Sequence, residues 1–441
     1  MLGSDALSKL YNPHHAIYLP AVNDSYADDC CKQLDPNRPF PGGVSLRDLV
    51  FWQPNALWHY PYLLHSVGLY PIGALPDNAV TQRDRTSCTL VGDSGGFQIG
   101  KGSMKGLKAV RAGPMAAVAA EQAWHMESAA REYIVGWLDT YSDYAMTIDM
   151  PLWAMSGDGK DSPFHNCTAE QLIDLTVQNL RFIDQAASGR AKWLNVVQGD
   201  AQGAYSRAWW DAVKWFRRGG WALAGSAGAK GGLVNVLRTL LRMRDDGAFE
   251  AGQDWVHVLG VSTPKWAVLL SAVQRALQRT NAALRISYDS SSPFQTAARY
   301  EEVAVAPNYT TDLRSWTIGV ESAPQSRLHV DPSLPRLVSF AHSPIGAKLY
   351  LHHLSVRDGK WEPRQFDSVT LALLTNHNVW VYLDAMARAN ELVAARDQSL
   401  VPALLLRGAD LIDEAFESPN WPEFLRRNSH YMDALAPNEY V

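Results

Sequence analysis

Short apolar runs that each end on a polar residue or a glycine recur along this chain, and a helical pattern follows most of them. These runs end at Asp93, Asp149, Gln198-Gly199, Gly225-Ser226, Gly260-Val261 and Asp289. Short apolar runs that alternate with helical segments are typical of parallel strands joined by helices. We therefore predict an α/β fold in which these residues lie at the carboxyl ends of strands, in a barrel or an open sheet.

Two of the strand ends carry a carboxylate. Asp93 is followed by Ser94 and two glycines, which leave room for a flat ligand to approach the backbone. Taken alone, this segment is better explained as an ordinary strand-to-helix turn capped by Asp and Ser. The second carboxylate, Asp289, ends another apolar run. Because catalytic groups collect at the carboxyl ends of parallel strands, the pair indicates an active site.

Other local signals predict individual elements. We expect strands or β-like pieces at 16–20, 302–306 and 315–319, and helices at 114–140, 168–187, 264–279 and 367–396. The second helix starts with a capping box at Thr168 and Gln171, and the third with a Thr-Pro pair. We interpret 45–66 as mixed helix and loop. Trp209, Trp210 and Trp215 are interpreted as packing residues of one helix.

Several motifs resemble the tRNA-guanine transglycosylase superfamily, in its order and with compatible spacing. They are Asp-Ser-Gly-Gly-Phe-Gln at 93–98, Val-Val-Gln-Gly at 196–199, Leu-Gly-Val-Ser-Thr-Pro at 259–264, Tyr-Asp-Ser at 288–290, Leu-Tyr-Leu-His-His-Leu at 349–354 and Thr-Asn-His-Asn at 375–378. The resemblance implies a (β/α)8 TIM barrel with insertions and a C-terminal helical and β-rich subdomain. We accordingly expect a barrel core at 1–300, an inserted β-rich segment at 301–345, and a C-terminal helical part at 346–441 that completes the barrel domain.

The resemblance also implies the role of each site residue. Asp289 falls at the nucleophile, which attacks C1′ of the sugar and expels guanine, and Asp93 at the general acid/base. The base-binding positions are Ser94, Asp149, Gln198, Gly199, Gly225 and Gly260. A carboxylate at Asp149 suits the N1–H and amine donors of guanine. Two alternatives stay open: Asp149 as a barrel-lining residue with a structural partner, and Gln198 as a turn residue.

The chain departs from the family at the zinc site. Val338, Phe340 and Ser343 stand where the tRNA enzymes have cysteine ligands, and only His377 remains. One imidazole cannot hold structural zinc, which takes about four ligands. We expect no metal and no other cofactor, and we interpret His377 as a hydrogen-bonded packing residue.

After the nucleophile, the tRNA enzymes of the family carry arginines that read the bases beside the target. In this chain Arg299 is the one candidate match to those arginines. We therefore expect an enzyme that replaces guanine in DNA with a free 7-deazaguanine, a preQ0-like base. A zinc-less enzyme that acts on tRNA is the alternative. A barrel glycosidase and a non-catalytic subunit of the family are further alternatives, and a homodimer is left open.

Composition sets outer limits on these expectations. The formal charge of −5 argues against coating nucleic acid by bulk electrostatics, but it leaves local phosphate contacts open. Four cysteines without a regular framework fit a reducing compartment. No apolar run reaches the roughly 18 residues of a membrane span, and no signal peptide is evident. We expect a protein of the cytoplasm of a bacterium or of a phage-infected host, without a membrane partner.

Overall fold

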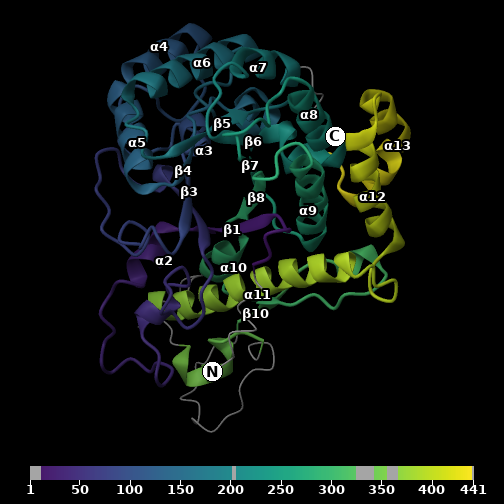
Figure 1. Ribbon diagram of the computed structural model, residues 1–441. Helices are drawn as coiled ribbons and strands as arrows, with labels where there is room; N and C mark the ends of the chain where they lie inside the picture. The colour runs from purple at the N-terminus through teal and green to yellow at the C-terminus, as the bar shows by residue number, and fades with distance from the viewer. Residues whose placement is uncertain (1–10, 201–204, 324–341, 355–365, 440–441) are drawn as a thin grey trace.

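The computed structural model describes residues 11–200, 205–323, 342–354 and 366–439. Eight parallel strands close into a barrel in chain order, with helices outside them, so the predicted (β/α)8 barrel is confirmed (Figure 1). The strands are β1 (Ile17–Val22), β2 (Tyr62–Ser66), β3 (Thr89–Asp93), β4 (Tyr144–Met146), β5 (Lys192–Val197), β6 (Gly220–Leu223), β7 (Trp255–Val258) and β8 (Arg285–Ser290).

The predicted helices form where their local signals place them. The helices up to β9 are α2 (Asp24–Asp29), α3 (Gly96–Gly100), α4 (Ala117–Met126), α5 (Ser128–Tyr141), α6 (Ala169–Ala186), α7 (Ser206–Val213), α8 (Gly232–Asp245), α9 (Pro264–Gln278) and α10 (Ser292–Tyr300). Thr168 and Gln171 make the expected capping box of α6. Thr263 caps α9, and Pro264 occupies its first turn, where no N–H is needed.

Three sequence-based interpretations are wrong. The segment 45–66 contains β2, which pairs with β1 and β3. The expected β-like piece at 315–319 is largely a turn, and strand β10 begins only at Gly319. Trp215 lies beyond the end of α7 and is 76% exposed, whereas Trp209 and Trp210 are buried as expected. For β2, pairing with strands distant in the sequence decides the structure.

The barrel strands divide their side chains between the lumen and the helices. Val91 and Leu194 belong to a small apolar cluster inside the barrel, whereas Leu90, Ile286 and Tyr288 belong to the larger core under the helices. Successive side chains of a strand point to opposite faces. Residues 91 and 93 of β3 and residues 287 and 289 of β8 therefore face the lumen, and both carboxylates stand above its apolar filling.

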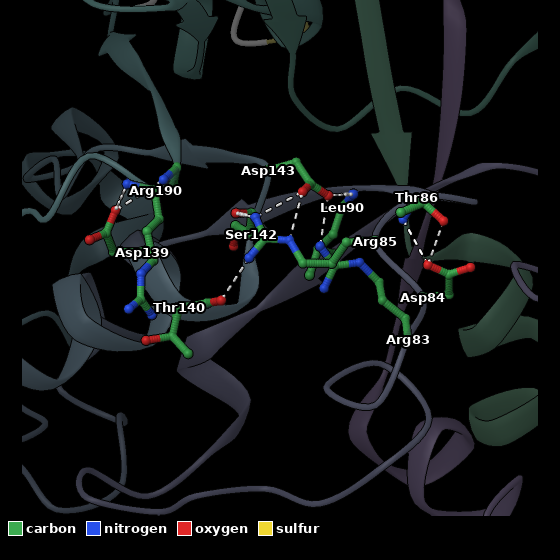
Figure 2. Close-up of polar contacts among 11 residues, drawn as sticks. Arg83, Asp84, Arg85, Thr86, Leu90, Asp139, Thr140, Ser142, Asp143 and Arg190 are labelled. Atoms are coloured by element: carbon green, nitrogen blue, oxygen red, sulfur yellow. Dashed lines mark hydrogen bonds and ion pairs between the residues drawn. The ribbon is translucent and has the colours of Figure 1, made fainter.

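An ion-pair cluster ties the amino ends of β3 and β4 together at the opposite end of the barrel (Figure 2). The buried Arg83 Nη2 lies 2.7 Å from Asp143 Oδ2, and Arg85 contacts the other oxygen at 2.9 Å. The same Asp143 accepts a hydrogen bond from the N–H of Leu90. Side chains at this end of a (β/α)8 barrel serve stability rather than chemistry.

The C-terminal part packs against the barrel helices. After the antiparallel hairpin of β9 (Glu302–Val305) and β10 (Gly319–Ser322), residues 342–354 form only short turns, so this part is helical from α11 onward. Helix α11 (Ser368–Ala394) packs on α10 and α9, α12 (Ala403–Glu417) on α9, and α13 (Trp421–Leu435) on α8 (Figure 1). Among the described residues, no helix combines the length and apolar character needed to cross a membrane.

Candidate active site

The predicted carboxylates meet at one end of the barrel. Asp93 is the last residue of β3, and Asp289 is the penultimate residue of β8. Asp149 and Gln198 follow the ends of β4 and β5, at the same mouth. The negative charge of Asp289 raises the pKa of Asp93, and that of Asp93 raises the pKa of Asp149. Three carboxylates therefore influence one another across a shared space.

The pKa of the Asp93 carboxyl lies above its ordinary value. Burial is the largest cause and raises its pKa, to which the charge of Asp289 adds. Hydrogen bonds from the Ser66 side chain and the Gly95 backbone act in the opposite direction without cancelling the rise. Ser66 stands directly across from Asp93 in the strand register. A carboxyl group with a raised pKa is suited to act as a general acid.

The Asp289 carboxylate is held through one of its two oxygens. Its Oδ1 accepts a hydrogen bond from the N–H of Gly260 at 3.0 Å and lies 3.2 Å from Nε2 of His257. The backbone is fixed as well, since the Asp289 carbonyl accepts a bond from the N–H of Val261 at 2.7 Å. The side chain keeps 15% exposure. An anchored and accessible carboxylate is suited to nucleophilic attack.

Asp149 and Gln198 form a buried pair beside these carboxylates. Nε2 of Gln198 donates to Oδ2 of Asp149 at 2.5 Å, although 49 residues separate them. Burial raises the pKa of Asp149 to about 6, against the effect of this hydrogen bond. Oε1 of Gln198 is buried and has no partner among the described residues. A buried polar atom without a partner is uncommon, and a bound ligand with an N–H group would satisfy it.

The predicted glycines bring backbone close to this pair. A Cβ on Gly96 would lie 3.0 Å from Oδ1 of Asp149, and a Cβ on Gly225 would lie 2.8 Å from Oε1 of Gln198. Gly225 also has a φ of 58°, which side chains rarely adopt. A Cβ on Gly199 would lie 2.6 Å from Oγ of Ser226. The close approaches at Gly96 and Gly225 leave no room for a side chain beside Asp149 and Gln198.

Two other predicted base-binding residues have protein partners. The Ser94 hydroxyl donates to the carbonyl of Thr147 at 3.1 Å and so ties the loop after β3 to the loop after β4. The N–H of Gly260 is used by Asp289. Ser94 can still accept a hydrogen bond, whereas the Gly260 N–H acts on the carboxylate and not on a base. The structure brings all the predicted positions to one mouth. The hydroxyl hydrogen of Ser94 and the N–H of Gly260 are already bonded to protein groups, so neither is free to donate to a ligand.

Two residues that contact the carboxylates were missed from the sequence. Ser66 lies in the segment that the sequence predicts as mixed helix and loop. His257 lies in the apolar run that ends at Gly260, which the sequence predicts only as a strand. The signal for His257 was present in Trp255-Val-His257-Val, since alternation places both side chains on the face that also holds Asp289 of the next strand. The contact with Asp289 became visible only with the strand register.

The histidine expected at the zinc position of the tRNA enzymes has protein partners at both ring nitrogens. Nδ1 of His377 lies 2.7 Å from Oγ of Ser343, and Nε2 lies 3.1 Å from the carbonyl of Ala304. Val338 and Phe340 fall outside the described residues. In the part of the chain that is described, no three His, Cys, Asp or Glu residues gather into a group able to hold a metal ion. His377 packs as a hydrogen-bonded histidine of α11.

The arrangement of the mouth determines which ligands it can bind. The neighbouring carboxylate whose charge raises the pKa of Asp93, in addition to burial, is Asp289. Carboxylates in such a space favour a ligand that donates hydrogen bonds and disfavour a phosphate. A scan against protein-family models finds no match for the chain, and a search of the curated proteins finds none either. Function therefore has to be inferred from the site itself.

Proposed function

We propose that this chain is a pentosyltransferase that exchanges guanine in DNA for a 7-deazaguanine through a covalent glycosyl-aspartate intermediate. The observation that carries the proposal is that two carboxyl groups lie at one barrel mouth: Asp289, which is anchored through Oδ1 and partly exposed, and Asp93, whose pKa is raised by burial. A nucleophile and a proton donor are the two groups that displacement at a sugar carbon requires.

The first half of the reaction forms the covalent intermediate. Asp289 attacks C1′ of a nucleotide flipped out of the duplex, the C1′–N9 bond breaks, and its electron pair leaves with the base. Asp93 gives its proton to the departing guanine. The carboxylate charge thus passes from Asp289, now an ester, to Asp93.

The second half reverses these roles. The incoming 7-deazaguanine gives its N9 proton to Asp93, its nitrogen attacks C1′, and the ester bond to Asp289 breaks. One glycosidic bond replaces another, so the exchange needs no ATP or redox group. Both active-site carboxyls return to their starting states.

The buried pair beside the carboxylates supports a guanine-like base. The carboxylate of Asp149 would accept from N1–H and the exocyclic amine, and the free Oε1 of Gln198 is an acceptor for a further N–H. Guanine and 7-deazaguanines share this donor edge.

The substrate is tested by guanine exchange. The protein is incubated with labelled guanine and either duplex DNA or tRNA, and the label retained in each nucleic acid is counted. We expect incorporation into DNA, and no incorporation by the Asp289→Ala variant. Exchange into tRNA alone would replace the DNA assignment, and exchange into neither would remove the proposal. Nucleoside mass spectrometry of DNA and tRNA from cells that express the chain would identify the inserted base.

A further inference from the structure

A chain of hydrogen bonds runs along the barrel lumen to Asp289. The indole N–H of Trp255 donates to Oγ of Ser287 at 2.7 Å, Oγ lies 2.9 Å from Nδ1 of His257, and Nε2 of His257 lies 3.2 Å from Oδ1 of Asp289. His257 and Ser287 are fully buried and stand across from each other in the register of β7 and β8. This series of hydrogen bonds therefore lies among the apolar side chains inside the barrel and ends at the carboxylate of Asp289, at the barrel mouth.

The contacts of His257 place a hydrogen on Nε2. An indole N–H can only donate, so Oγ of Ser287 accepts from Trp255. The same oxygen can donate its hydrogen to an unprotonated Nδ1 of His257 or accept from a protonated one, because a hydroxyl oxygen has two lone pairs. A lone pair on Nε2 would face the carboxylate of Asp289, so in both arrangements Nε2 carries a hydrogen and donates it to Oδ1.

Both donors to Asp289 use the same oxygen. Nε2 of His257 and the N–H of Gly260 converge on Oδ1, and among the described residues Oδ2 has no hydrogen-bond partner. Hydrogen bonds to a carboxylate oxygen fix the rotation of the group and withdraw charge from the oxygen that accepts them. Oδ2 is left as the more nucleophilic atom, on a side chain that remains partly exposed.

We propose that His257 is a positioning residue that holds Oδ1 of Asp289, so that Oδ2 is the atom that forms the ester with C1′. This inference rests on the proposed function. In the covalent step the Oδ2–C1′ bond forms, the C1′–N9 bond breaks, and the departing base takes the proton of Asp93. His257 keeps its own proton throughout. It acts by orientation, and by favouring the carboxylate when the ester breaks in the second half.

The test compares variants of His257 in steady-state guanine exchange. His257→Leu removes the donor, and we expect kcat to fall by about 10- to 100-fold, the factor for losing one hydrogen bond to a charged group. The KM for guanine should change little, because His257 does not contact the base-binding pair. His257→Gln offers an amide N–H at a similar reach and should recover kcat to within about threefold of wild type.

His377→Leu is the matched control. His377 is also a fully buried histidine with contacts on both ring nitrogens, but these are to Ser343 and Ala304. This variant should lose stability while the kcat of the folded fraction stays within about twofold of wild type. Thermal melting of each variant supplies the folded fraction. Ser287→Ala leaves His257 in place but removes the hydroxyl that contacts Nδ1 and fixes the ring, so its kcat should lie between those of wild type and His257→Leu.

The outcomes separate this inference from the proposed function. If wild type exchanges guanine and folded His257→Leu matches its kcat, His257 does not position the nucleophile. The same holds if His257→Gln is as slow as His257→Leu at equal folding, or if KM alone changes. If His257→Leu does not fold, His257→Gln and Ser287→Ala decide: wild-type kcat in Ser287→Ala with a slow His257→Gln would overturn the inference. Absence of exchange in wild type would instead remove the proposed function.

Discussion

Replacing Asp149 by asparagine should stabilise the protein at neutral pH while weakening its affinity for guanine. Burial raises the pKa of Asp149 from the ordinary value of 3.8 to about 6. At ~1.4 kcal/mol for each pH unit, keeping this carboxylate ionised in the empty fold costs ~3 kcal/mol. The asparagine side chain cannot ionise, and its oxygen can still accept from Nε2 of Gln198.

The sign of the pH dependence follows from the direction of the pKa change. Between about pH 4 and pH 6 the folded protein keeps a proton on Asp149 that the unfolded chain has lost, so this residue's contribution to stability declines as pH rises through that window. It is fully present below pH 4 and absent above pH 6. The stability of Asp149→Asn relative to wild type should therefore increase by ~3 kcal/mol from pH 4 to pH 7.5.

Urea unfolding of both proteins across this pH range measures the difference. Asp139→Asn is a control of opposite sign: burial opposes the change, but hydrogen bonds from Ser188, Ala191 and Arg190 lower the pKa of Asp139. Its relative stability should decrease as pH rises. A difference between Asp149→Asn and wild type that is flat with pH, or that falls, would refute the electrostatic description of the mouth.

Three further substitutions test the candidate site and the ion-pair cluster at the amino ends of β3 and β4. Asp289→Ala should reduce exchange by at least ~10³-fold with unchanged melting, as measured with labelled guanine; retained exchange would exclude it as nucleophile. Gly225→Ala brings a Cβ within 2.8 Å of Oε1 of Gln198 and should raise the KM for guanine by ~10-fold or more. Gly252→Ala, also at positive φ but in open space, should leave KM unchanged, and equal KM values for the two variants would contradict a role of Gly225 in keeping Gln198 in place. Arg83→Met should lower the free energy of unfolding, measured in urea, by ~3 kcal/mol without changing kcat. A large loss of kcat would contradict a purely stabilising role for Arg83.

Local sequence signals account for much of the barrel. The capping box at Thr168 and the Thr263-Pro264 pair define helix starts through contacts within one turn, so the sequence predicts them directly. The segment Tyr62–Ser66 has no such signal. Its five residues lack a clear alternation of apolar and polar side chains, and pairing with β1 and β3 makes it a strand.

In the candidate site, too, the sequence predicts some residues and misses the contacts between others. Asp93 and Asp289 could be recognised because each ends a strand in a distinctive motif. The bond between Gln198 and Asp149 joins two loops, and the contact of His257 with Asp289 joins two neighbouring strands. These pairs depend on barrel closure and strand register, which no local pattern specifies. The sequence therefore predicts the reacting groups better than the residues that hold them.

The most direct test of the account is to find the bond that Asp289 is proposed to form. The protein is mixed with a short guanine-containing DNA duplex, quenched with acid, digested, and analysed by mass spectrometry, with a tRNA sample and the Asp289→Ala variant alongside. We predict that the peptide containing Asp289 carries a DNA adduct that has lost one guanine base. Guanine exchange without that adduct in the wild type, or with an adduct on another residue, would contradict it.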